Sequence, residues 1–130
     1  EICACLVGSE MCIRDRLLGS RNDTVELYQG MDAFFLPSFF EGLPVTGVEA
    51  QAMGLSMVVS DTVTREMVYT DLVDYVSLND TPEAWASRLE IALRKNAKRE
   101  QYADRLKLSN FSNIGCGNRL EQVYCWWING

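Results

Sequence analysis

The chain has 130 residues, of which 48% are hydrophobic and 23% charged, a composition that indicates one globular domain with a substantial core. Its formal net charge of −6, from 12 basic and 18 acidic residues, argues against a nucleic-acid-binding surface, because such surfaces neutralise phosphates with lysine and arginine. The absence of histidine excludes Cys/His zinc sites and histidine-based triads within this chain.

The amino-terminal segment differs from the rest of the sequence. It begins at Glu1 rather than methionine, and "GSEMCIRDR" interrupts the pattern of the residues that follow. We therefore expect residues 1–16 to be non-native or irregular and residues 17–127 to form one domain of a longer protein. The alternative is that "CACLVG" is a native strand that leads into a polar turn.

The first predicted elements are a helix and a strand. Asn22 or Asp23 is placed to cap a helix over Thr24–Met31, with Glu26 at the position that completes a capping box. The apolar run Ala33–Leu36 is too short for a helix and predicts a strand buried on both faces.

The middle of the chain repeats this alternation. Val45–Met53 predicts a helix, and Gly54 is placed as its C-cap. Leu55–Ser60 and Val73–Leu78 predict two further strands. Short apolar strands that alternate with helices indicate an α/β fold with right-handed β-α-β units and a parallel sheet.

The last third of the chain predicts helices. Asp80 or Thr81 is placed to cap a helix that begins at Pro82. Its apolar stripe at spacings of three and four contains Trp85, Leu89, Ala92 and Leu93. "AKREQYADRLKL" predicts a second helix, and "NIGCGNRLEQVYCWW" a helical tail.

Two glutamates lie on either side of the start of the second predicted helix. Glu41 is in the loop that follows a strand, and Glu49 is about one turn into the helix. In open parallel α/β sheets, ligands bind beyond the carboxyl ends of the strands. The first amides of the helix, around residues 43–47, are unpaired donors that favour a phosphate, and a carboxylate matches a vicinal diol such as ribose. Gly42 and Gly47 would let the ligand approach the backbone. These residues are also compatible with a simple turn and a favourable helix dipole.

The longer stretch "DAFFLPSFFEGLPVTGVEAQAMGLSMVVSD" is more specific. It resembles the donor-binding domain of family 4 retaining glycosyltransferases, in which a Glu, seven residues and a second Glu follow a "PS…EG.P" loop. The likeness extends over roughly residues 17–126 and is greatest to the branch that builds capsular polysaccharides and exopolysaccharides. It implies a Rossmann-like domain, one half of the two-domain GT-B arrangement, with a helical C-terminal tail.

The resemblance also implies roles for individual residues. Glu41 would be the catalytic residue that contacts the donor sugar, and Glu49 would bind the ribose hydroxyls of the nucleotide. The loop Gly19–Asn22, with Arg21 and Asn22, would lie near the base. The backbone amides that would meet the sugar and the diphosphate are those of Gly42, Leu43, Val45 and Thr46.

The resemblance implies a nucleotide-sugar substrate such as a UDP- or GDP-sugar, with no cofactor. The chain has no Asp-x-Asp pair for a divalent metal, so we expect none to be required. The acceptor would be a glycan or a lipid-linked sugar, held by an N-terminal domain absent from this sequence. The family's Arg and Lys diphosphate clamp also precedes this region, so we expect the chain alone to be inactive.

The expected location is the cytoplasm, with peripheral association at the inner face of the membrane, and no nucleic-acid partner. The alternative function is a non-catalytic nucleotide-sugar-binding or regulatory module of the same fold. A third class, another α/β nucleotide or phosphate enzyme, would be supported by a G-x-G-x-x-G or G-x-x-x-x-G-K motif, and the sequence has neither.

Overall fold

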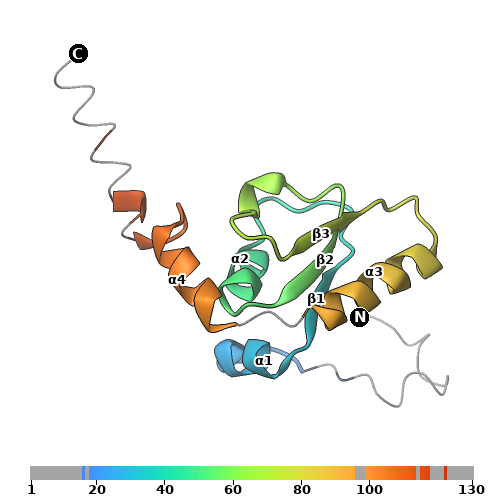
Figure 1. Cartoon of the computed structure of the whole chain (residues 1–130), viewed down its shortest axis with the longest axis horizontal. Coiled ribbons are helices and arrows are strands. Elements are labelled where there is room, and N and C mark those ends of the chain that lie inside the picture. Colours follow the sequence, from blue (N-terminus) through green and yellow to red (C-terminus); the bar gives the residue numbers. More distant parts are fainter. Residues whose placement is uncertain (1–15, 17, 96–98, 114, 118–121, 123–130) are drawn as a thin grey trace.

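The chain folds around a parallel sheet with the strand order β1-β2-β3 (Figure 1). The strands are β1 (Ala33–Leu36), β2 (Ser56–Ser60) and β3 (Val73–Val76). The computed structural model describes residues 16, 18–95, 99–113, 115–117 and 122. The segments 1–15 and 118–121 and most of the predicted helical tail lie outside these residues.

Helices cover both faces of the sheet (Figure 1). The helices are α1 (Thr24–Gly30), α2 (Val45–Ala52), α3 (Pro82–Arg94) and α4 (Glu100–Leu108), with the 3-10 helix η2 (Arg65–Met67) between β2 and β3. α2 packs on one face and α3 on the other, while α4 packs against α2. The α/β prediction with a parallel, helix-flanked sheet is confirmed.

Strand β2 supplies side chains to both cores because successive residues of a strand point to opposite faces. Met57 and Val59 belong to the core under α2, together with Met67 from η2. Val58 points the other way and packs with Ala92 of α3. All five residues of β2 are buried, as expected for the central strand of a covered sheet.

One arginine from the last third of the chain holds the end of helix α1. Arg99, which precedes α4, donates hydrogen bonds to the carbonyls of Gln29 (3.0 Å) and Met31 (2.6 Å). Carbonyls at the end of a helix lack intrahelical donors, so a guanidinium there satisfies them and complements the helix dipole. This contact joins the end of α1 to the start of α4.

Three local predictions are wrong. Asp23 occupies the N-cap position of α1 but makes no capping hydrogen bond, because Arg21 binds its carboxylate. Phe35 is 46% exposed, so β1 is not buried on both faces. Leu93 is 51% exposed because the buried stripe of α3 follows Trp85, Leu89 and Ala92 instead.

The remaining boundaries agree with the structure to within two residues, except that α4 begins three residues later than the helix predicted over residues 97–108. Thr81 is the N-cap of α3, and its hydroxyl accepts a hydrogen bond from the amide of Ala84. Gly54 follows α2 with φ of +69°, a conformation that glycine adopts without strain. None of the helices in the described part of the chain is long and apolar enough to cross a membrane.

Candidate functional site

The loop that carries Glu41 leaves the carboxyl end of β1 and is anchored to the end of β2. The carbonyl of Ser38 accepts hydrogen bonds from the hydroxyls of Ser60 and Thr62, the latter at 2.8 Å. Ser60 is fully buried, whereas Thr62 is exposed, so the anchor lies at the boundary between the core and the surface. Neighbouring parallel strands have their carboxyl ends at the same edge of the sheet. At that edge, residues at the end of β2 bind the first residues of the loop that follows β1.

Glu41 is half-buried and is held by the same residue. The Ser38 hydroxyl donates a hydrogen bond of 2.8 Å to Oε1 of Glu41. A hydroxyl bond to a charged carboxylate is stronger than one between neutral groups. Oε2 of Glu41 has no hydrogen bond within the described residues and is available to a ligand.

Glu49 lies on the exposed side of α2 and is held by a different element. The Tyr28 hydroxyl of α1 donates a 3.1 Å hydrogen bond to Oε2 of Glu49 and lies 3.4 Å from the carbonyl of Thr46. The Tyr28 residue is only 7% exposed. Burial, together with the hydrogen bond to Glu49 and its charge, raises the pKa of Tyr28 to about 12. Tyr28 therefore keeps its proton and remains a donor at neutral pH.

The start of α2, between the two glutamates, offers open backbone donors. Pro44 is the N-cap and supplies no side-chain acceptor, while its carbonyl accepts from the amides of Gly47 and Val48. The amides of Val45 and Thr46 have no acceptor in the described part of the chain, and both residues are exposed. Such a helix end combines free N–H groups with the positive end of the dipole, which favours an anion.

The two glycines of this segment have different roles. A Cβ on Gly42 would meet no atom within 4 Å, so packing does not require glycine there and a ligand can approach the backbone. A Cβ on Gly47 would lie 2.8 Å from Sδ of Met67 and 3.3 Å from Cε of Met57. Gly47 is thus needed for packing of α2 on the core. The expectation that it lets a ligand approach the backbone is wrong.

Arg21 and Asn22, predicted to lie near the base, are exposed residues before α1. Arg21 donates to Asp23 through Nε at 2.6 Å, which raises the pKa of Arg21 and lowers the pKa of Asp23. No hydrogen bond in the described residues connects Arg21 or Asn22 with either glutamate. Their base-binding role, like the roles of Glu41, Glu49 and the amides, stays a prediction.

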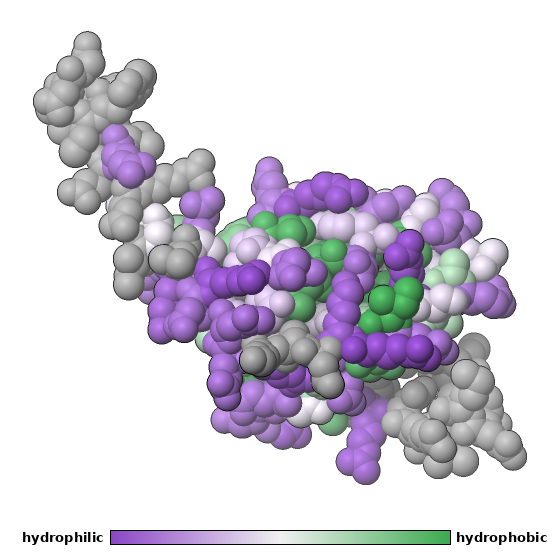
Figure 2. All heavy atoms as spheres, viewed as in Figure 1, coloured by the Kyte–Doolittle hydropathy of each residue, from purple (hydrophilic) through white to green (hydrophobic). Residues whose placement is uncertain are grey.

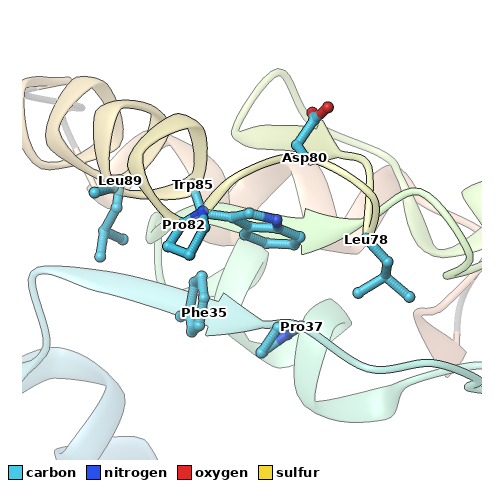
Figure 3. A pocket seen from close by; sticks show the side chains of 8 residues that line it. Phe35, Pro37, Leu78, Asp80, Pro82, Trp85 and Leu89 are labelled. Atoms are coloured by element: carbon cyan, nitrogen blue, oxygen red, sulfur yellow. The ribbon is translucent and has the colours of Figure 1, made fainter.

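An apolar groove of about 480 Å³ lies on the α3 face of the sheet, apart from both glutamates. Figure 3 shows its centre, where the Trp85 ring approaches Phe35 edge-on, with a centroid distance of 5.4 Å and an interplanar angle of 84°. Pro37 and Leu78 lie at one end of the groove. Asp80 is the one charged residue in the lining and the rest of the lining is apolar, so the groove offers few of the donors and acceptors that a nucleotide sugar requires. Figure 2 also shows apolar surface in the middle of the face where Figure 1 places the sheet.

Sequence reasoning missed the hydroxyl donors of both glutamates. Tyr28 reads as one more apolar contact of its helix, and Ser38 as the residue that follows a strand. The Tyr28 hydroxyl reaches Glu49 only when α1 packs beside α2. Ser38 is three positions from Glu41, but its carbonyl is anchored only when β1 ends beside β2. No cluster of three or more possible metal ligands occurs among the residues that the structure describes.

The family described as "Glycosyl transferases group 1" matches residues 11–95. This chain belongs to that family. The matched region includes the whole sheet, both glutamates and the open start of α2. No solved structure gave a significant match.

Three curated relatives are similar to parts of this group 1 chain. "Putative glycosyltransferase EpsF" of Bacillus subtilis is 35% identical over 86 residues, which are 65% of this chain and 22% of the relative. A Campylobacter jejuni protein named N,N'-diacetylbacillosaminyl-diphospho-undecaprenol alpha-1,3-N-acetylgalactosaminyltransferase is 57% identical over 44 residues, 34% of this chain and 12% of its own. An Escherichia coli protein named UDP-Gal:alpha-D-GlcNAc-diphosphoundecaprenol alpha-1,3-galactosyltransferase is 42% identical over 55 residues, 41% of this chain and 14% of its own. The matches therefore span less than a quarter of the length of these relatives.

Proposed function

We propose that this chain is the donor-binding part of a longer retaining glycosyltransferase that uses a nucleotide sugar. One arrangement carries the proposal: two hydroxyl-held glutamates on either side of an open helix start, at the carboxyl edge of a parallel sheet. Membership of the group 1 family supports it, because the matched region contains these residues. The chemistry of the three parts matches the three parts of the donor: ribose, diphosphate and sugar.

In this proposal each part of the site has one role. Glu49 accepts hydrogen bonds from the ribose hydroxyls, and Glu41 contacts the donor sugar. The amides of Val45 and Thr46, with those of Gly42 and Leu43, bind the sugar and diphosphate. The acceptor hydroxyl forms a bond to the anomeric carbon on the face that the diphosphate leaves, and its proton passes to the departing diphosphate. Oriented amides that stabilise this charge lower the barrier.

The acceptor would be a glycan or a lipid-linked sugar. Two relatives are named for diphospho-undecaprenol substrates, which supports a lipid-linked acceptor and a parent protein peripherally bound at the inner membrane face. The acceptor-binding domain and the basic clamp for the diphosphate would precede this region. We expect this chain alone to bind UDP- and GDP-sugars weakly or not at all, and to transfer nothing. Micromolar binding in calorimetry, or measurable transfer, would contradict this expectation.

Substitutions in the full-length enzyme test the site itself. Glu49→Gln should raise the KM for the donor at least tenfold, and Glu41→Gln should lower kcat more than KM changes, since only the second contacts the reacting sugar. Glu90→Gln on α3, an exposed acid away from the site, is the matched control. Wild-type kinetics for both site variants would reject the proposed site.

The proposal includes no metal, because the helix start and basic residues would bind the diphosphate in place of a divalent ion. Transfer by the full-length enzyme should continue in excess EDTA. Loss of transfer that is restored by Mg²⁺ or Mn²⁺ would contradict this part of the proposal.

The second candidate is a non-catalytic module of the same fold that binds a nucleotide sugar. A full-length protein that binds the donor but neither transfers nor hydrolyses it would support this alternative.

A further inference from the structure

Each of the two site glutamates receives a hydrogen bond from one hydroxyl, and the two hydroxyls come from different parts of the fold. Tyr28 reaches Glu49 from α1, and Ser38 reaches Glu41 from the end of β1. In both cases one carboxylate oxygen is occupied and the other has no partner within the described residues. Each carboxylate is thus oriented by the protein while one oxygen remains for a ligand.

Tyr28 is suited to this task because its position is fixed. Tyr28 is 7% exposed as a residue and packs in the core cluster that includes Val48, and Arg99 holds the end of its helix α1. Glu49, in contrast, is exposed and would otherwise sample several rotamers, whose loss on ligand binding is unfavourable. The hydrogen bond from Tyr28 restricts the rotamers of Glu49 before a ligand binds.

Ser38 is fixed by its own backbone. Its carbonyl accepts from the buried Ser60 hydroxyl and from Thr62, so its hydroxyl starts from a defined place at the sheet edge. Glu41 is in an irregular loop, where no regular backbone ladder would hold it. The bond from Ser38 is therefore the contact that connects the loop carboxylate to the sheet.

We propose that Tyr28 and Ser38 are positioning residues, Tyr28 for the ribose-binding Glu49 and Ser38 for the sugar-contacting Glu41. This inference rests on the proposed function of the two glutamates. The bond that breaks joins the donor sugar to the diphosphate, whereas the ribose is remote from it. Loss of the two hydroxyls should therefore change different kinetic constants. Loss of the Tyr28 hydroxyl weakens donor binding, whereas loss of the Ser38 hydroxyl slows transfer.

The test uses the full-length enzyme with Tyr28→Phe and Ser38→Ala. Removing a hydrogen bond to a charged group changes an equilibrium by about tenfold. We therefore expect Tyr28→Phe to raise the donor KM about tenfold with kcat within about twofold, and Ser38→Ala to lower kcat about tenfold with little change in KM. The matched controls are Tyr75→Phe and Ser87→Ala, which remove hydroxyl donors to the carbonyls of Thr64 and Glu83 outside the site.

Double variants separate positioning from a general structural effect. In the Glu49→Gln background, Tyr28→Phe should have little further effect on KM, because residues that act through one another are not additive. Likewise, in the Glu41→Gln background, Ser38→Ala should have little further effect on kcat. Full additivity, or an equal change in the control variants, would overturn the inference. If the glutamate variants alter the kinetics while Tyr28→Phe and Ser38→Ala do not, the positioning role fails and the proposed function stands. If the glutamate variants also have no effect, the proposed function fails.

Discussion

Gln51 is completely buried and makes four hydrogen bonds, one within α2 and three to η2 and the segment that follows it. Its Nε2 donates to the carbonyls of Gly47 (3.1 Å) and Met67 (2.9 Å). Its Oε1 accepts from the amide of Tyr69 (3.2 Å) and the hydroxyl of Thr70 (2.9 Å). All donors and acceptors of the amide are therefore used. We expect Gln51→Met, which retains the length of the side chain, to destabilise the fold strongly.

The magnitude follows from the groups left without partners. Met67 C=O and Tyr69 N–H have no other hydrogen-bond partner in the described residues, while half-exposed Thr70 can turn to water. Each buried group without a partner costs about 1–3 kcal/mol. The two together predict a loss of about 3 kcal/mol in the free energy of unfolding, a large part of the roughly 5–15 kcal/mol typical of a domain.

Urea unfolding followed by far-UV circular dichroism measures this loss. With an m value of about 2 kcal/mol/M, the midpoint should fall by roughly 1.5 M at unchanged m. Gln101→Met, at an exposed position of α4, is the matched control and should change stability by no more than about 0.5 kcal/mol. If Gln51→Met costs no more than Gln101→Met, the hydrogen-bond argument is refuted.

Three further measurements test separate features. Gly47→Ala should cost about 1–3 kcal/mol in urea unfolding, because its Cβ would lie 2.8 Å from Met67 Sδ and overpacking exceeds the gain in helix propensity; a more stable variant would contradict this. Thr81→Ala should cost about 1 kcal/mol in the same assay, because the cap of α3 is lost, and an unchanged midpoint would reject the cap. Burial raises the pKa of Tyr28 and of Tyr69 from 10.0 to about 12, so their contribution to stability is complete below pH 10 and is lost as the pH rises through about 12. Tyr69→Phe should reduce this alkaline loss in unfolding measured from pH 9 to 12, and an unchanged pH profile would contradict it.

Much of the fold could be predicted because its elements have strong local patterns. The apolar run Ala33–Leu36 became β1 with the same bounds, and Thr81 followed by Pro82 marked the start of α3. What local patterns do not contain is which residues a neighbouring element will cover. The exposure of Phe35 and the position of Leu93 depend on where α3 crosses the sheet, which is a property of the tertiary packing.

Local sequence patterns also predicted part of the candidate site, but not the contacts that depend on tertiary packing. Glu41 and Glu49 could be singled out because their spacing places one at the end of a strand and the other near the start of a helix. The long-range contacts that position these glutamates could not be predicted from the sequence. Tyr28 is 21 positions from Glu49, and Ser60 is 22 from Ser38, so only the packed fold brings their hydroxyls into hydrogen-bond distance.

The segment from Gly42 to Gly54 shows why a motif is not by itself a map of a site. Gly42 has open space around its Cα and Glu49 is exposed, so both face the proposed ligand. Gly47 and Gln51 face the core, one to let methionine side chains approach and the other to satisfy buried backbone groups. Gly54 is needed for its positive φ and for the close approach of Arg99. Because core and ligand roles alternate around one helix, substitutions at Gly42 and Glu49 should change donor affinity at constant stability. Those at Gly47 and Gln51 should reduce stability first, and affinity only as a consequence.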